Sequence, residues 1–234
     1  MKNLKSLMTG MIMIFIISCQ QKKSDAIELK SRVIKKEIKT EPNKVVFDNL
    51  DLILSPFEDM TEFALDKNKN GIIKSMSKIE EINSKGIFEK NIASQSVLLL
   101  KTKIERLKKL INHNSYNEIA LFSTEIFEFN ISNFTDGSKI DNQIQIEHLD
   151  YMGFKNLALL NQNNVDWEKL KHITENSQKI WASLSPKVAD KNLKDTFDLL
   201  FEGLSIGIKN KDVKICRVFS NMDLTLVDVL EKSI

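Results

Sequence analysis

From Val46 to the end of the chain, apolar residues recur every three or four positions, the period of an amphipathic helix. In the first half the stripes are Leu52, Phe57, Met60, Phe63 and Ala64; Ile72, Ile73, Met76, Ile79 and Ile82; Val97, Leu100, Ile104, Leu107 and Ile111; and Ile119, Phe122, Ile126 and Phe129. In the second half we expect helices at 145–161, 165–184, 191–209 and 212–232. Only seven Gly and three Pro occur in 234 residues, whereas turn-rich β architectures need both. The chain is therefore predicted to be all-α.

The two halves align without gaps at a constant offset of 97 residues, which pairs Leu100 with Phe197 along matching stripes. Four amphipathic helices joined by short loops are typical of an antiparallel bundle. We therefore expect two tandem antiparallel four-helix bundles related by an internal repeat, at 46–137 and 138–234. A single stack of eight helices paired as hairpins is the alternative.

Three local signals mark the ends of predicted helices. Ser115 with Glu118 three residues later has the pattern of a capping box. Asp136-Gly137 predicts a turn between the halves, and Ser185-Pro186 predicts a break between two helices of the second half.

The chain begins with a basic segment and a short apolar run, densest at 11–17. This run is shorter than the about 20 apolar residues that cross a bilayer, so it predicts a signal peptide. It ends in Ile16-Ile17-Ser18-Cys19, which resembles the lipobox of bacterial lipoproteins. In that family the Cys thiol takes a diacylglyceryl group and a peptidase cuts before it. The resemblance implies a signal peptide at 1–18 and lipid attachment at Cys19.

Residues 19–45 are polar and charged and predict a lipidated tether; whether 27–38 forms a short helix stays open. Acyl chains on Cys19 would hold the body at a membrane of the cell envelope. The residues after Cys19 are Gln20-Gln21 and not Asp. In Gram-negative bacteria this resembles a signal that directs a lipoprotein to the outer membrane.

Charge and cysteine content limit the partners. Without the two lysines of the signal peptide, Lys2 and Lys5, the 34 basic residues become 32 and equal the 32 acidic ones. There is no net positive charge to hold nucleic acid. Cys216 is then the only thiol apart from Cys19, so no internal disulfide is expected. Its helical pattern predicts a small buried side chain.

The second half is also similar to the cytochrome c-prime type of four-helix bundle. The resemblance is carried by Val165-Asp166-Trp167 before the second helix and by Asn210-Lys211-Asp212 before the fourth. That family attaches haem through C-x-x-C-H near the end of the fourth helix, and 220–228 contains neither Cys nor His. The resemblance therefore implies a haem-less bundle.

The segment 66–71 matches the first half of a calcium loop, with Asp66, Asn68 and Asn70 as oxygen ligands and Gly at the sixth position. The twelfth position is Ser77 where calcium needs a bidentate Glu. A polar turn between helices is the favoured interpretation, and weak calcium binding is the alternative.

His148 and Met152 lie one helical turn apart and could bind copper or non-covalent haem with His172 or Met222. A surface His beside a core Met is the plainer interpretation. Core or interface packing is likewise expected for the two tryptophans, Trp167 and Trp181.

No Ser/His/Asp set, phosphate loop or two-Cys metal site occurs in the sequence. We therefore expect no enzyme activity, catalytic residue, cofactor or metal site. The function predicted is a membrane-anchored envelope lipoprotein that acts as a helical binding or protein-interaction module, with a protein partner of unknown identity. A copper or non-covalent haem carrier is the alternative.

Overall fold

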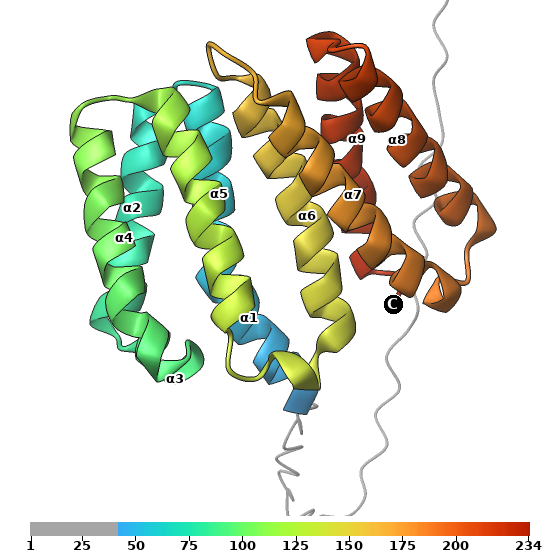
Figure 1. Ribbon diagram of the computed structural model, residues 1–234. Helices are drawn as coiled ribbons and strands as arrows, with labels where there is room; N and C mark the ends of the chain where they lie inside the picture. The colour runs from blue at the N-terminus through green and yellow to red at the C-terminus, as the bar shows by residue number, and fades with distance from the viewer. Residues whose placement is uncertain (1–41) are drawn as a thin grey trace, which may run out of the picture. The chain divides into compact units, whose positions relative to one another are not determined.

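The computed structural model describes residues 42–234 and shows them as helices with short connections (Figure 1). The α-helices are α1 (Pro42–Leu65), α2 (Lys69–Ser84), α3 (Ile87–Asn91), α4 (Ser94–Asn112), α5 (Tyr116–Asn133), α6 (Asp141–Leu160), α7 (Trp167–Leu184), α8 (Lys191–Lys209) and α9 (Val213–Glu231). The prediction of an all-α fold is confirmed. The predicted signal peptide (1–18), Cys19 and most of the tether predicted at 19–45 lie outside the described residues, and α1 already begins at Pro42.

The helices pack mostly antiparallel to their neighbours (Figure 1). Helix α1 contacts α2 and α5, and α4 packs on α5. Helix α6 contacts α7 and α9, and α8 packs on both α7 and α9. Helix α6 also contacts α5 and α1, so it is the element that joins the first half of the body to the second.

The apolar side chains gather in two clusters. One is formed by α1–α5 with Tyr151 and Ala158 of α6, and the other is formed by side chains of α6–α9. Because α6 contributes to both, residues 42–234 fall within one compact unit. Tandem bundles related by a repeat stay a prediction.

The predicted helices of the second half agree with α6–α9 to within four residues at each end. The turns after α5 and α7 are short 3-10 helices, Gly137–Lys139 and Ser185–Lys187. The core assignment is wrong for two residues, Leu52 and Ile73, which are 43% and 48% exposed. Each neighbours the true core positions, Ile53 and Ile72, in sequence and therefore points away from them.

Ser115 is the N-cap of α5, but its side chain makes no capping hydrogen bond, so the predicted capping box is wrong. Its backbone lies at ψ 65°, away from the extended conformation in which an N-cap side chain reaches the first turn. Helix α5 itself begins after Ser115, as the sequence pattern predicted.

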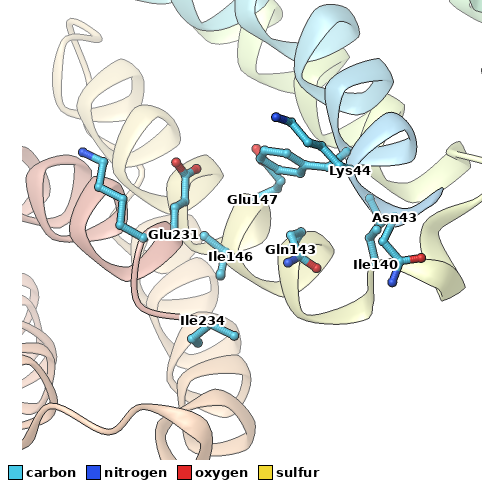
Figure 2. A pocket seen from close by; sticks show the side chains of 10 residues that line it. Asn43, Lys44, Ile140, Gln143, Ile146, Glu147, Glu231 and Ile234 are labelled. Carbon is cyan, nitrogen blue, oxygen red and sulfur yellow. The ribbon is translucent and has the colours of Figure 1, made fainter. Parts of the chain in front are cut away.

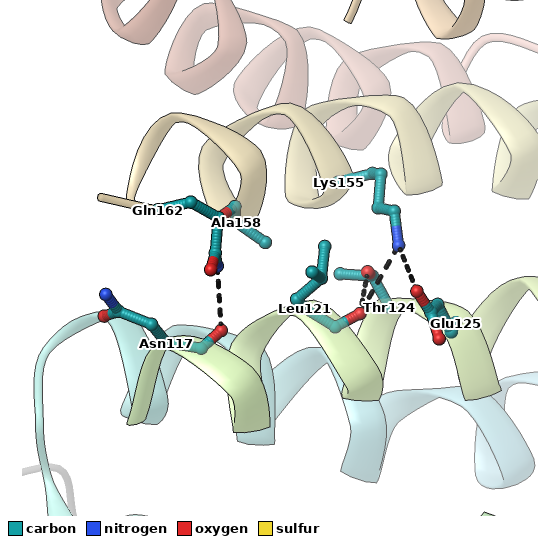
Figure 3. A network of polar contacts seen from close by, with 7 residues as sticks. All are labelled: Asn117, Leu121, Thr124, Glu125, Lys155, Ala158 and Gln162. Atoms are coloured by element: carbon teal, nitrogen blue, oxygen red, sulfur yellow. Dashed lines mark hydrogen bonds and ion pairs between the residues drawn. The ribbon is translucent and has the colours of Figure 1, made fainter. Parts of the chain in front are cut away.

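The seam between α5 and α6 is partly polar (Figure 3). Lys155 of α6 is 1% exposed and donates to the carbonyl oxygen of Leu121 and to the carboxylate of Glu125, each at 3.4 Å. Burial lowers the pKa of Lys155 from 10.5 to about 8. Gln162 donates to the carbonyl oxygens of Asn117 and Ala158 at 3.0 Å.

None of the helices within residues 42–234 combines the length and apolar character that a membrane span requires.

Candidate functional site

A hollow of about 460 Å³ with an acidic lining lies where α1, α6 and α9 meet. We call it the acidic groove. It is lined by Glu58, Asp59, Glu62, Asp150, Phe154, Asn221, Leu224, Thr225 and Asp228. Five of these nine side chains are carboxylates. The lysine that reaches the lining, Lys78 of α2, pairs with Asp59 at 2.7 Å between Nζ and Oδ2. The groove therefore attracts cations.

Three carboxylates meet at the base of this groove. Glu58 of α1 and Glu147 and Asp150 of α6 each offer an oxygen, and these oxygens lie within 4.8 Å of one another. We call these residues the carboxylate triad. Glu147 and Asp150 are three residues apart, so both lie on the face of α6 toward α1. Glu147 is 5% exposed. Among residues 42–234, no hydrogen bond or ion pair satisfies any carboxylate of the triad.

Burial and mutual repulsion both work against ionisation of the triad. Burial is the largest cause that raises the pKa of each of the three carboxyl groups. Repulsion adds to it: Asp150 raises the pKa of Glu58, Glu58 raises that of Glu147, and Glu147 raises that of Asp150. The site therefore needs either protons or a cation to offset its charge.

A fourth acid, Asp223 of α9, is buried behind the triad. It is 0% exposed, and neither carboxylate oxygen has a hydrogen-bond partner among the described residues. It packs against Gly153, one turn beyond Asp150, where a Cβ atom would lie 2.8 Å from its Oδ2. Its charge contributes to the raised pKa of Asp150. Burial raises the pKa of Asp223 itself, and the nearby backbone N–H of Gly153 lowers it by a smaller amount.

A second hollow, of about 570 Å³, reaches the triad from the end of the body at which the described chain starts and stops (Figure 2). Glu147 lines it together with Glu231, Lys44 and Lys232. The triad thus lies between two hollows, Glu58 and Asp150 lining one and Glu147 the other. Water and small ions can approach the three carboxylates from both sides.

The arrangement is suited to binding positive charge. The described lining of the acidic groove contains no His, Cys or Lys side chain. Carboxylate oxygens are the ligands that hard divalent cations prefer, and they also pair with Lys and Arg of a partner. The site can therefore hold a metal ion, a basic partner or both.

Residues 66–68 form the turn between α1 and α2, as the favoured interpretation predicted, and 69–71 begin α2. The Oδ1 of Asn68 accepts from the backbone N–H of Gly71 at 3.0 Å and caps α2. Gly71 is needed because a Cβ there would lie 2.3 Å from the ring of Phe63. The side-chain oxygen of Asn68 is therefore engaged in capping α2. Calcium binding by this loop stays the untested alternative.

His148 and His172 line one hollow of about 380 Å³ between α6 and α7, together with Glu128 and Tyr151. Burial lowers the pKa of His148, which favours its neutral form. Neither histidine belongs to a group of three or more metal-competent side chains within residues 42–234.

The two methionines of the alternative copper or haem site belong to the second core cluster or pack on it. Met152 is 0% exposed, and Met222 packs on the cluster from its edge. The plainer interpretation is confirmed for Met152, which is a core residue, but His148 is half-buried and not the surface residue that it expected.

Cys216 and the tryptophans pack as predicted. Cys216 is 0% exposed, and burial raises its pKa to about 11, so the thiol stays protonated at neutral pH. Trp181 stacks on Phe197, with ring centroids 4.3 Å apart, and donates from Nε1 to Asp198. Trp167 packs on the second core cluster.

The carboxylate triad was missed in the sequence because its outermost members, Glu58 and Asp150, are 92 residues apart and meet only through helix packing. One signal was present. At the offset of 97, Glu147 and Asp150 correspond to Leu50 and Ile53, both fully buried apolar residues. Acids at core positions of a helical stripe are costly and indicate a site.

In comparisons with family models, curated proteins and solved structures, nothing matches this chain.

Proposed function

We propose that this chain is a lipid-anchored protein of the cell envelope whose helical body binds a basic protein partner in the acidic groove and catalyses no reaction. The observation that carries the binding role is the groove itself, with five carboxylates and a single paired lysine. A partner that presents Lys or Arg would offset this charge and gain charge-assisted hydrogen bonds.

A basic peptide of defined sequence tests the groove. Fluorescence anisotropy with a labelled Lys-rich peptide should show binding that weakens as salt rises. Reversing two groove charges, Glu62→Lys with Asp228→Lys, should weaken binding by about tenfold or more, because close charge pairs contribute 1.5 kcal/mol or more.

The matched control reverses two exposed acids on other helices, Glu118→Lys on α5 and Glu175→Lys on α7. It changes net charge by the same amount away from the groove. Equal weakening in both double variants would reject the groove as the binding surface.

The anchor is supported by the lipobox resemblance of Ile16–Cys19. Cys19→Ser should release the protein from membranes into the soluble fraction, since acyl chains provide the attachment. Mass spectrometry of the wild-type amino terminus should find an acylated Cys.

Gln20-Gln21 supports sorting to the outer membrane in Gram-negative bacteria. Recovery of the protein from the inner membrane would reject that location.

For the fold, we propose two tandem four-helix bundles that arose by duplication. The turns before α5 and α9 support this. Asn114 and Lys211, 97 residues apart, both have left-handed backbone, with φ of 51° and 54°. The hydrogen bonds around them also match: N–H of Ser115 to O of Leu110, and N–H of Asp212 to O of Gly207.

The second candidate function is a copper or non-covalent haem carrier, and the shared hollow of His148 and His172 favours it. The absorption spectrum and metal content of the purified protein test this candidate. Stoichiometric copper or a Soret band that is lost in His148→Ala would support it, and a metal-free protein after loading would reject it.

A further inference from the structure

The carboxylate triad has the chemistry of a cation site. All of its donors are oxygen atoms, and carboxylates bind as one or two ligands each. Two ligands on opposite sides of a calcium ion are about 5 Å apart, because each Ca–O distance is 2.3–2.6 Å. The triad oxygens, all within 4.8 Å of one another, fit inside that sphere.

The burial of two side chains distinguishes this cluster from an ordinary acidic surface. Glu147 is 5% exposed, points into the triad and has no partner among the described residues. Asp223 is fully buried with both oxygens unpartnered and lies against the turn of α6 that follows Asp150. Buried carboxylates are normally hydrogen-bonded or paired, and those left unpartnered indicate a missing charge.

Within residues 42–234, no lysine or arginine pairs with the triad to fill this role. Lys78 is held by Asp59 at the edge of the groove. The lysines of the second hollow, Lys44 and Lys232, are exposed and form no ion pair with a triad residue. The two hollows leave room for the waters that complete the coordination shell of a hard cation.

We propose that Glu58, Glu147 and Asp150 bind one hard divalent cation of calcium type, with Asp223 as a second acid behind the ligands. Three carboxylates around a doubly charged ion leave a small net charge, and Asp223 strengthens the attraction without touching the ion. The sequence predicted no metal site, and this proposal departs from that prediction because the ligands meet only in the folded chain. It does not depend on the protein partner proposed above.

Calorimetric titration of CaCl₂ into the EDTA-treated full chain tests the site. The expected result is one calcium ion per chain, with a calcium-dependent rise in Tm because the ion binds the folded state alone. Glu147→Gln and Asp150→Asn should each abolish the Tm rise. Asp223→Asn should weaken binding by about 10–100-fold, the usual effect of an outer-shell group.

Two controls locate the ion. Glu175→Gln removes an exposed acid of α7 and should bind calcium as the wild type does. Asp66→Asn removes the one carboxylate of the loop at 66–71 and should also bind normally. Loss of binding in Asp66→Asn with retention in Glu147→Gln would assign calcium to that loop and overturn the proposal. Absence of calcium binding to a folded wild-type chain would overturn it as well.

Discussion

Three ionisable residues of the helical body are buried, where a charged side chain is unfavourable. Glu147 and Asp223 are carboxylic acids with almost no exposure to water, and Lys155 is a lysine that is 1% exposed. Burial raises the pKa of the two acids and lowers the pKa of Lys155, because a low-dielectric interior disfavours the charged form of each group. Such groups reduce the stability of the folded chain at neutral pH, so their presence needs an account beyond packing.

The acids predict a direction for the pH dependence of stability in EDTA. Above the ordinary Glu pKa of 4.5, the unfolded chain releases protons that the folded triad still holds, because the pKa of Glu147 is raised in the fold. The unfolded state then binds fewer protons, so the free energy of unfolding falls as pH rises from about 4.5 toward neutral.

Glu147→Gln should lessen this fall and stabilise the chain at pH 8 by about 1–3 kcal/mol, since it removes an unpaired buried charge. Urea unfolding at pH 5 and pH 8 measures both effects. Glu175→Gln on the exposed face of α7 serves as the control and should leave the pH profile unchanged. A wild-type chain more stable at pH 8 than at pH 5 would contradict the prediction.

At the scale of elements, close helix contacts depend on glycine. Gly203 and Gly207 lie one turn apart on α8 and face α9. A Cβ at Gly203 would lie 2.1 Å from the ring of Phe219, and one at Gly207 would lie 2.7 Å from the Sγ of Cys216. These contacts explain how α8 and α9 approach closely enough to bury that thiol.

Gly203→Ala should therefore destabilise the protein by about 1–3 kcal/mol, even though alanine is the better helix former, because the added methyl overpacks the contact. Thermal unfolding by circular dichroism measures the change. Ser205→Ala, at an exposed position of the same helix, should shift the free energy by less than about 0.5 kcal/mol. Unchanged or raised stability of Gly203→Ala would show that Phe219 moves aside.

Helix positions were largely predictable from the sequence, because the apolar period of α6–α9 is regular and bounded by turn residues such as Pro186 and Asp212. The five-residue α3 was not predicted, since one turn carries no period. The acidic groove was not predicted either. Periodicity assigns faces within one helix, whereas the groove depends on which helices lie side by side.

At the scale of the whole molecule, α6 makes the two halves interdependent. Its residues 151–160 are all buried, between α5 on one side and α9 on the other. Because one helix completes both apolar clusters, neither half can lose its packing without exposing the other.

Unfolding should therefore be a single transition. Both tryptophans, Trp167 and Trp181, lie in the second half, so their fluorescence reports that half alone. Circular dichroism at 222 nm reports all helices. The two signals should give the same urea midpoint, within error. Separate midpoints would show that the two halves unfold as independent domains.

The two ends of the described chain share one hollow, which Asn43 and Lys44 line together with Lys232 and Ile234. A fluorescent protein or affinity tag fused after Ile234 would therefore sit beside the residues at which the described chain begins. The connection 161–166 lies at the other end of α6, about 30 Å away at 1.5 Å per residue. It is the better insertion point for any reporter meant to leave the end near Asn43 and Ile234 undisturbed.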